Sequence, residues 1–477
     1  MDIGIEEQQA LYQKRIPIYP RSVKGKFRNF KWAVLGLAYS VFFLLPWLPW
    51  SRASGPTQPI AFDLAARRFY IIDVVMFPQD VIWLALLLAI AATLLFFVTG
   101  LVGRAFCGYF CFQTLWTDAF ILIERLIQGE RPARIRLHRQ DWNAEKVVKL
   151  AATHIVWLAL AFATALTFVL YFGDAQTLVA RIFQGQAAAA AYITLGVLTA
   201  STYIAAGWAR EQICTYICPY ARFQGVMYDP ETLTVLYDEP RGEGSRGRVA
   251  PRQGLKKREE RLAQGHGDCI DCGFCVQVCP TGIDIREGLQ YQCISCGLCA
   301  DACNTIMDSM GYPRGLIRYD SLTNLATPTP RKPRIEWRRF KVLGYAIAMV
   351  TLSGLLGYAV SERSLFEASV QQVRQPLYVI MADGSIRNRY QIRINNKTEQ
   401  DQVYRIEARG LPPHSLDLGS FAQIRVRAGS SVTIPASVRL TPALARQTHD
   451  FEVLVIPAAT PAQALQKRAH FSSREAG

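Results

Sequence analysis

The stretch CIDCGFCVQVCP occupies residues 269–280, and the stretch CISCGLCADACN follows at residues 293–304. Each has four cysteines in the order Cys-x2-Cys-x2-Cys-x3-Cys. Paired Cys-x2-Cys units occur in zinc sites and in iron–sulfur sites, so the units alone leave the metal open. Eight cysteines in this doubled order favour iron–sulfur clusters over zinc. Disulfides are disfavoured if the segment faces the reducing cytoplasm, as the charge pattern below predicts.

The spacing also predicts how the eight thiolates divide between two 4Fe–4S clusters. In bacterial two-cluster ferredoxins, three cysteines of one run and the fourth of the other run surround each cluster. The first predicted cluster is bound by Cys269, Cys272, Cys275 and Cys303. The second is bound by Cys293, Cys296, Cys299 and Cys279. Two neighbouring clusters pass electrons, so we predict an electron-transfer module at about residues 262–310.

Two further cysteine pairs stand where long apolar runs end, in GRAFCGYFCF at residues 103–112 and AREQICTYICPY at residues 209–220. The pairs are Cys107 with Cys111 and Cys214 with Cys218. Each pair has an arginine before it and a Phe-Gln dipeptide after it, which indicates an internal repeat.

The Cys-x3-Cys spacing favours a metal over a disulfide. If each pair lies on a continuous helix, its Cβ atoms are about 5–6 Å apart on one face. A disulfide needs a Cβ separation of roughly 3.8 Å. Thiolates select Cu(I), zinc or iron–sulfur iron, so we expect the two pairs to bind a shared soft metal. The alternative is that these four cysteines are small, buried apolar side chains.

Composition indicates a membrane protein, because 51% of the 477 residues are hydrophobic and this exceeds what one soluble core needs. Five nearly uncharged runs come close to the roughly 20 residues that cross a bilayer as a helix. They are Trp32–Pro49, Val81–Val102, Leu150–Phe172, Ala187–Trp208 and Val342–Val360. We therefore predict five transmembrane helices.

The positive residues predict the orientation, because short cytoplasmic loops are enriched in lysine and arginine. Clusters precede the first run at 24–31, separate the second from the third at 104–149 and precede the fifth at 331–341. With five helices, all three clusters lie inside together with the N-terminus and the cluster module. The net charge of +15 is thus mostly a topology signal, and no nucleic-acid partner is expected.

No haem is expected, because a haem between helices usually needs two axial ligands. His154 is the one histidine inside a predicted membrane helix, and we interpret it as an interfacial side chain. Methionine is also sparse, with seven residues, so we expect no methionine-rich copper store.

Beyond the fifth run, alternating apolar and polar residues predict an outer β-sandwich. The alternation is clear in RYQIRIN (389–395), VYRIEAR (403–409), SVTIPASV (431–438) and FEVLVI (451–456). We expect this domain to bind a partner, and the alternative is a stabilising cap.

The predicted organisation has five parts. They are a cytoplasmic N-terminal segment (1–31), a four-helix membrane domain with the first thiol pair (32–208), a cytoplasmic segment with the second pair and the ferredoxin-like module (209–339), a fifth transmembrane helix (340–361) and the outer β-sandwich (370–460).

These features together resemble the FixG/RdxA/CcoG family, accessory factors for assembly of cbb-type haem–copper cytochrome c oxidases. The resemblance runs through IPIYPRSVKGKFRNFKW (16–32), FCGYFCFQTLWTD (106–118), REQICTYICPYARFQG (210–225), the cluster module and GYPRGLIRYDS (311–321). It implies a C-terminal immunoglobulin-like domain in the periplasm and a location in the bacterial cytoplasmic (inner) membrane.

The resemblance also implies an activity: a cupric reductase that passes electrons through two 4Fe–4S clusters to Cu(II). The family's copper motif is Cys-x3-Cys-Pro, which corresponds here to Cys214, Cys218 and Pro219. It corresponds less closely to Cys107 and Cys111, because Phe112 replaces the proline and the helix break there becomes an open question. Implied partners are membrane lipid, copper ions, oxidase assembly factors or copper chaperones, and an unidentified electron donor.

Two other functions share these features. The chain could be a quinol-linked polyferredoxin subunit of a respiratory chain, which differs in the electron acceptor. It could also be a non-catalytic oxidase assembly scaffold whose clusters only stabilise the fold. Deletion of residues 370–477 would separate the scaffold from both enzymes, since the outer domain would then carry the function.

Overall fold

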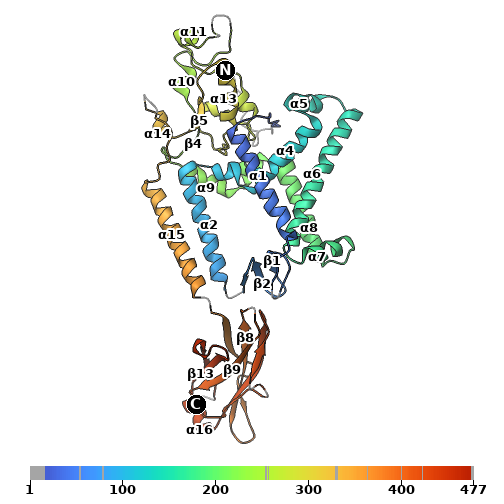
Figure 1. Ribbon diagram of the computed structural model, residues 1–477, viewed down its shortest axis with the longest axis vertical. Helices are drawn as coiled ribbons and strands as arrows, with labels where there is room; N and C mark the ends of the chain where they lie inside the picture. Colours follow the sequence, from blue (N-terminus) through green and yellow to red (C-terminus); the bar gives the residue numbers. More distant parts are fainter. Residues whose placement is uncertain are drawn as a thin grey trace, which may run out of the picture. The chain divides into compact units, whose positions relative to one another are not determined.

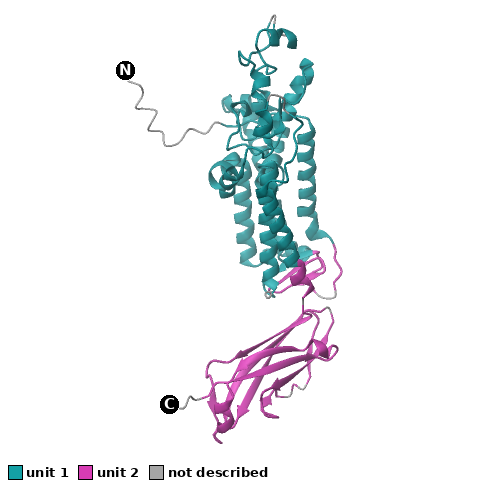
Figure 2. Cartoon of the chain, turned by 90° about the vertical axis from the view of Figure 1, so that its left-hand side faces the viewer, with its two compact units in different colours: residues 1–48, 60–66, 78–356 teal, residues 49–59, 67–77, 357–477 magenta. Residues whose placement is uncertain are grey.

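The computed structural model describes residues 17–52, 55–77, 80–252, 255, 257–327, 331–362, 364–398, 400–419, 421 and 423–473. Residues 1–16 of the predicted N-terminal segment lie outside this range. The chain forms two compact units (Figure 2). The first unit comprises residues 1–48, 60–66 and 78–356, and the second comprises residues 49–59, 67–77 and 357–477.

Long apolar helices dominate the first unit. Its elements outside the cysteine-rich segment are α1 (Lys26–Leu44), η1 (Leu45–Trp47), β1 (Ile60–Asp63), α2 (Val81–Val102), α3 (Ala105–Tyr109), α4 (Phe112–Gln128), α5 (Arg131–Arg139), α6 (Ala144–Leu170), α7 (Ala175–Phe183), α8 (Ala189–Thr202), the π-helical η3 (Tyr203–Ala209) and α15 (Phe340–Ser361).

Six stretches of the described chain are long and apolar enough to cross a membrane, so the prediction of exactly five is corrected. Five coincide with the predicted runs, and the sixth is Ala105–Gln128, which combines α3 and α4. The sequence pattern missed this stretch because Arg104 precedes it and Asp118, Glu124 and Arg125 interrupt it. In the folded chain Arg104, Asp118 and Glu124 are buried and paired, so they do not exclude the segment from an apolar environment.

The same effect explains why α1 begins six residues before the predicted run. Lys31 is 1% exposed, and its Nζ lies 2.9 Å from the Asp118 carboxylate. Arg28 also contacts Asp118, at 3.3 Å. Burying a charge is costly unless it is paired. This carboxylate therefore lets the helix begin inside a basic stretch.

Contacts show where the sixth stretch begins and ends within the helical bundle. At its start, the Tyr109 hydroxyl donates to the carbonyl oxygen of Cys296 at 2.8 Å. At its end, Gln128 Nε2 donates to Thr153 in the early turns of α6, also at 2.8 Å. The α6 helix then ends beside α1, where the Tyr171 hydroxyl donates to the carbonyl oxygen of Phe42 at 3.0 Å.

Helix α1 starts at the cysteine-rich segment and ends beside the end of α6. Its first turn faces the cysteine-rich segment, since Arg28 N donates to Asp301 Oδ2 at 2.8 Å. Its last turn meets the end of α6, so α1 and α6 run in the same direction. Helix α2 ends at the cysteine-rich segment, where Leu233 N donates to Leu101 O at 3.1 Å. The segment between α2 and α6 therefore begins and ends at the same end of the bundle.

Large side chains hold α1, α4, α6 and α8 together. Trp116 Nε1 donates to Thr164 Oγ1 at 2.8 Å, and Trp157 Nε1 donates to the carbonyl oxygen of Phe120 at 3.1 Å. Phe120 is fully buried. On another side of the unit, α15 lies beside α2, and the rings of Phe96 and Tyr345 stand 6.0 Å apart (Figure 1).

The cysteine-rich segment consists of short elements. They are η4 (Ile213–Ile217), α9 (Pro219–Met227), β4 (Thr234–Tyr237), α10 (Glu239–Glu243), α11 (Arg258–Ala263), α12 (Phe274–Gln277), η5 (Ile285–Glu287), α13 (Leu298–Met310), β5 (Ile317–Asp320) and α14 (Leu322–Leu325). Strands β4 and β5 pair antiparallel, with Thr234 opposite Asp320.

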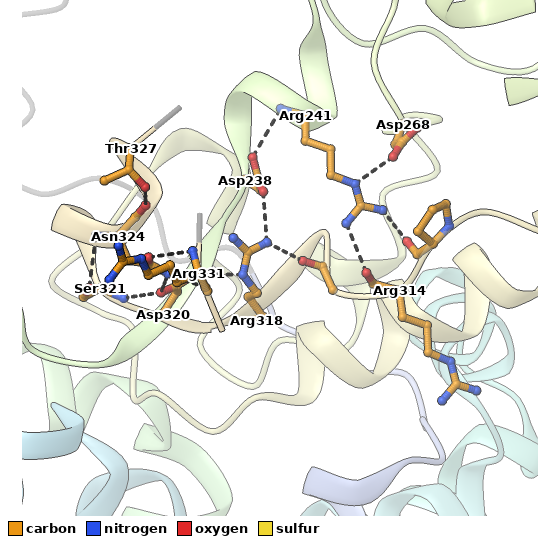
Figure 3. A network of polar contacts seen from close by, with 12 residues as sticks. Asp238, Arg241, Asp268, Arg314, Arg318, Asp320, Ser321, Asn324, Thr327 and Arg331 are labelled. Atoms are coloured by element: carbon orange, nitrogen blue, oxygen red, sulfur yellow. Dashed lines mark hydrogen bonds and ion pairs between the residues drawn. The ribbon is translucent and has the colours of Figure 1, made fainter. Parts of the chain in front are cut away.

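A polar network holds this segment in place (Figure 3). Arg318 bonds Asp238 at 2.9 Å and Asp320 at 2.8 Å, which ties the two strand ends together. Arg241 bonds the buried Asp268 at 2.7 Å. Asp268 immediately precedes Cys269, so this ion pair fixes the start of the first cysteine run.

The second unit is rich in β structure. Its elements are β2 (Arg68–Ile71), β3 (Val74–Met76), β6 (Phe366–Gln372), β7 (Val379–Ile380), β8 (Ile386–Asn396), β9 (Gln402–Arg409), β10 (Leu416–Asp417), β11 (Ile424–Val426), β12 (Ser431–Leu440), α16 (Pro442–Gln447), β13 (Asp450–Pro457), η6 (Pro461–Gln463) and β14 (Leu465–His470).

Strands β2 and β3 pair antiparallel with each other, whereas β6 to β14 form two antiparallel sheets that share one apolar core. One sheet has the order β10-β12-β8-β6, with β7 also paired to β8, and the other has the order β11-β9-β13-β14. Inward residues alternate along β8, where Tyr390, Ile392 and Ile394 are buried. The prediction of a C-terminal β-sandwich from period-two alternation is confirmed.

Candidate iron–sulfur and thiol site

The eight cysteines of the two runs line two cavities. The first cavity is lined by Cys269, Cys272, Cys275 and Cys303. The second is lined by Cys275, Cys279, Cys293, Cys296 and Cys299. The structure thus brings together the four thiols of each predicted cluster, and Cys275 borders both cavities. The assignment of individual ligands stays a prediction.

Local backbone geometry repeats between the two runs. Asp271 and Ser295 both have positive φ, at 51° and 49°, and each lies just before the second cysteine of its run. Gly273 and Gly297 then begin α12 and α13 in the left-handed conformation. At Gly297 a side chain is also excluded by space, because a Cβ would lie 2.7 Å from the Phe27 ring.

Burial shapes the chemistry of these thiols. It raises the pKa of Cys275, Cys293 and Cys303 to about 12. Nearby thiols raise the pKa further: for Cys303 they are Cys275, Cys269 and Cys272. Thiolates packed this closely need positive charge to be stable. Binding of a cationic metal group would therefore release protons from these cysteines.

The residues fit a 4Fe–4S cluster in each cavity. Among the described residues, no three His, Cys, Asp or Glu side chains close on a single metal ion. In a 4Fe–4S cluster the four thiolates bind four different irons, so they stand farther apart than the ligands of one ion. Each cavity is mostly apolar and is lined by the four thiols of one predicted cluster. This arrangement fits a 4Fe–4S cluster better than it fits a zinc site.

The membrane-edge thiols lie at helix breaks. Cys111 separates α3 from α4 and has an extended backbone, with φ −66° and ψ 131°. Cys218 separates η4 from α9 with nearly the same values, φ −72° and ψ 110°. The assumption that each pair shares one face of a continuous helix is therefore wrong. Cys107 lies in α3, and Cys214 lies in the π-helical turn η4.

The break at Cys111 forms although Phe112 replaces proline. The α3 helix ends at Tyr109, and α4 begins at Phe112, where the ring stacks on Trp116 with centroids 4.0 Å apart. Proline favours the first helical position but is not required there. The helix therefore breaks at the first pair without proline, and Cys111 has nearly the same extended backbone as Cys218.

The four membrane-edge thiols converge in the folded chain. Burial raises the pKa of Cys214 to about 12, and the nearby thiols of Cys111, Cys107 and Cys218 raise it further. Cys107 is buried, whereas the other three are partly exposed. Since no group of three metal-binding side chains is preformed in the described chain, the structure does not show a closed four-thiol metal site.

Each half of the internal repeat bonds the other through its glutamine. Gln224, from the second repeat, accepts from Cys107 Sγ at 3.1 Å and from Arg104 Nε at 3.2 Å. Gln113, from the first repeat, donates to the carbonyl oxygens of Ala205 at 2.8 Å and Arg210 at 3.1 Å. The sequence identified the Phe-Gln dipeptides as a repeat, but it assigned these glutamines no role.

The first thiol pair also touches the cluster module. Cys107 and Cys296 belong to one buried apolar cluster. Beside Cys107, a Cβ on Gly108 would lie 2.7 Å from the carbonyl oxygen of Ile294 and 3.0 Å from the Cα of Cys296. Glycine at 108 therefore permits this close approach. Sequence reasoning missed Gly108 and Tyr109 because their partners lie almost 190 residues away.

The fold and the site define a class of protein: an iron–sulfur redox protein with several apolar helices, which indicate membrane association, and a C-terminal immunoglobulin-like domain. A family model described as a 4Fe-4S dicluster domain matches residues 209–322. A second, described as an IG-like fold at the C-terminal of FixG, matches residues 356–474. The chain belongs to the FixG/RdxA family.

Whole-chain comparisons support this membership. Protein RdxB of Cereibacter sphaeroides is 43% identical over 91% of this chain and 89% of its own length. Protein RdxA of that organism is 43% identical over 84% of both chains. Nitrogen fixation protein FixG of Rhizobium meliloti is 39% identical over 84% of this chain and 81% of its own length.

A crystal structure of a FixG-related protein from Vibrio parahaemolyticus covers 24% of this chain and 99% of its own. It is 18% identical with a TM-score of 0.21, which is too low to support an argument.

Proposed function

We propose that this chain is a membrane-bound electron-transfer protein that reduces Cu(II) to Cu(I) at its membrane-edge thiols, for assembly of a cbb-type haem–copper oxidase. The observation that carries the proposal is the contact between the two thiol sets. Cys107 packs in one apolar cluster with Cys296, which lines the second cavity. A group reduced in that cavity would thus stand close to a thiol that can bind copper.

The residues of the two runs would hold two 4Fe–4S clusters in the cavities that they line. When bound, such clusters accept and release single electrons. The protein surrounds the cavities with apolar side chains, including Val235, Ile285, Ile306 and Leu316, and thereby limits access of water.

The membrane-edge thiols suit copper as a substrate. Cu(I) prefers soft thiolate ligands, so sulfur ligands favour the reduced ion. Cys111 and Cys218 each cap a helix N-terminus, whose partial positive charge favours an anionic ligand. Binding at Cys214 releases a proton, because burial raises the pKa of its thiol. An open arrangement of thiols would also let the ion leave after reduction.

We further infer the topology. The stretch Ala105–Gln128 begins and ends at the same end of the bundle, so five crossings remain. Basic segments then place the N-terminus and the cluster module in the cytoplasm, and the immunoglobulin-like domain in the periplasm of a bacterial inner membrane. A reporter fused after Asp450 should be active only outside the cytoplasm, and one fused after Gly265 only inside it. Equal behaviour of both fusions would contradict this topology.

The proposed partners follow from this chemistry. They are lipid around the apolar helices, copper ions, an electron donor, and oxidase assembly factors or copper chaperones that accept Cu(I). The immunoglobulin-like domain offers a surface for such a protein partner.

Copper reduction by anaerobic, prereduced protein tests the proposal. Cu(I) is followed with a Cu(I)-selective chelator. The double variant Cys214→Ala with Cys218→Ala should retain the EPR signals of both clusters and lose most of the reduction rate. Thr215→Ala with Tyr216→Phe, which keeps both thiols, is the matched control and should reduce copper like wild type.

The variant that also lacks Cys107 and Cys111 decides the outcome. If it reduces copper at the wild-type rate with intact clusters, the thiols are structural and the proposal fails.

A further inference from the structure

A second candidate site lies away from the thiols, at the end of the bundle where α4 meets α6. It is a cavity of about 250 Å³. Five segments form its walls: residues 17–19, α4, α5 with His138, α6 and the end of η3 with Arg210. No sequence pattern identified this cavity, because its residues come from five separate stretches.

Polar groups converge on the cavity from several sides. Gln128 Oε1 is buried and has no hydrogen-bond partner among the residues that the structure describes. His154 Nδ1 is bonded to the Tyr203 hydroxyl at 3.0 Å, which leaves Nε2 as the ring nitrogen for a ligand. His138 is similarly oriented by the Tyr19 hydroxyl, at 2.9 Å from its Nδ1. The cavity therefore offers a buried acceptor and two imidazoles.

Charge in the cavity is already balanced locally. Glu124 is 8% exposed and bonds two guanidinium groups, Arg134 at 3.0 Å and Arg210 at 2.5 Å. This carboxylate is therefore occupied by the protein itself. Arg134 is fully buried and does not line the cavity, so the lining carries one carboxylate, Glu124, and one guanidinium, Arg210, which bond each other. A neutral polar ligand is therefore favoured.

Aromatic side chains give the cavity flat walls. His154 stacks on Trp208 with an interplanar angle of 15° and centroids 5.6 Å apart. Trp157 meets His154 edge-on at 5.2 Å. Next to the cavity, α6 exposes apolar side chains, including Val147, Val148, Ile155 and Leu158. A planar ring fits between such walls, and an apolar tail could lie along the exposed face of α6.

One wall of the cavity also adjoins the cluster module. Ile18 lines the cavity, and its Cδ1 lies so near Gly282 that a Cβ there would approach to 2.8 Å. Gly282 follows Thr281, whose Oγ1 lies 3.2 Å from the Sγ of Cys279. Residues 17–21 are anchored to the module where Arg21 N donates to Gln277 O at 2.8 Å. A short path thus joins this cavity to Cys279.

We propose that this cavity binds a membrane quinol, which serves as the electron donor of the chain. The proposal rests on the proposed function for its electron acceptor. Gln128 Oε1 accepts a hydrogen bond from one quinol hydroxyl, and His154 Nε2 accepts from the other. The aromatic walls hold the ring, and the apolar tail lies on the lipid-facing side of α6.

The step is a two-electron oxidation. Two O–H bonds of the quinol break and two C=O bonds form, which gives a quinone, two protons and two electrons. His154 takes the proton of the hydroxyl that it binds, and His138, which lines the cavity and is exposed to solvent, takes the proton of the other hydroxyl. The cysteine runs would hold the two clusters that accept one electron each, and Ile18 and Thr281 lie between this cavity and Cys279.

Binding of decylubiquinol to the anaerobic, prereduced full chain in lipid nanodiscs tests the site without turnover, because the reduced protein accepts no further electrons. Gln128→Leu and His154→Phe should each weaken binding about tenfold, the effect of one lost buried hydrogen bond. Gln184→Leu, at the C-terminal end of α7, and His414→Phe, in the second unit, are matched controls that should bind like wild type. Iron content and elution volume show that the variants are folded.

The outcomes separate this proposal from the copper proposal. If both variants bind decylubiquinol like wild type, the quinol site is overturned. His154→Gln provides a second test should His154→Phe not fold. Copper reduction by variants prereduced with dithionite should stay at the wild-type rate, since dithionite bypasses the cavity. Failure of the wild type in that second assay would overturn copper reduction while quinol binding still stands.

Discussion

The twelve cysteines of this chain occupy two contrasting environments. Eight line two mostly apolar cavities, and of these Cys269, Cys275, Cys293 and Cys296 are buried whereas Cys272 is exposed. The other four lie in or beside short helical turns that break, and three of these four are partly exposed. All twelve residues are cysteines, so their packing decides what each can do. Thiols that line a cavity are suited to hold a permanent metal group, and thiols at partly exposed helix ends are suited to exchange a metal ion.

Cys107 links the two environments. It is the buried member of the membrane-edge set, and it packs with Cys296 of the cluster set. Its Sγ donates to Gln224, whereas Cys111 and Cys218 lie at helix N-termini. Variants of the residues on either side of this contact therefore test whether the two sets of thiols have distinct roles.

The largest effect is expected from removing one thiol of each set. Cys293→Ala should lose the second cluster, so that about half of the iron disappears from anaerobic protein. Cys107→Ala, which removes a thiol of similar burial, should keep all of it. Iron analysis and EPR check both variants. Equal iron loss in the two would show that the sets are not distinct.

A side chain at the contact between the sets should have the next largest effect. In Gly108→Ala the new Cβ meets the Ile294 carbonyl at 2.7 Å, which should cost about 1–3 kcal/mol of unfolding free energy and slow copper reduction. Denaturant unfolding and the chelator assay measure this. Gly344→Ala, in α15 with open space around the new Cβ, is the control. Wild-type behaviour of Gly108→Ala would show that the contact is loose.

The glutamines of the repeat should have unequal roles. Gln224→Leu removes the acceptor of Cys107 and Arg104, so copper binding should weaken while iron content stays normal. A buried donor left without a partner costs about 1–3 kcal/mol. Gln113→Leu removes bonds to two backbone carbonyls and to the Thr117 hydroxyl, none of them to a thiol, and should affect stability without affecting copper affinity. Titration with Cu(I) under a competing chelator distinguishes them, and identical affinities would remove Gln224 from the site.

The smallest effect is expected at Tyr109. Tyr109→Phe loses the hydrogen bond to the Cys296 carbonyl oxygen and keeps the ring. Unfolding free energy should fall by about 1 kcal/mol, with iron content unchanged. Phe30 packs against the same ring at 4.9 Å, so Phe30→Leu reports on the packing alone. A substantial iron loss in Tyr109→Phe would mean that this hydrogen bond maintains the cavity itself.

Sequence patterns predicted the local features well. Period-two alternation in β8 and β12 identified the C-terminal sandwich, because alternate side chains of a strand face one core. The run Val81–Val102 was predicted with the same bounds as α2. The cysteine spacing predicted two groups of four thiols, and the members of each group line one cavity, with Cys275 bordering both. The assignment of ligands stays a prediction.

The helix count and the break at Cys111 depended on distant partners. The charged residues of Ala105–Gln128 argue against an apolar helix in the sequence alone. In the folded chain Asp118 is paired with Lys31, which offsets the cost of burying its charge. The break before Phe112 was uncertain without proline, and it forms where α4 packs Trp116 against α6. Neither partner is adjacent in the sequence, so no local pattern could reveal it.

By itself the sequence determined which segments are apolar and which alternate, because these properties depend on neighbours within a few residues. Only the tertiary structure decided that Cys107 and Cys296 share one apolar cluster, that Gln224 bonds Cys107 and that five separate stretches enclose a cavity beside Gln128. Such contacts join residues that are tens to hundreds of positions apart. Their formation depends on how whole helices pack, which is a property of the complete fold.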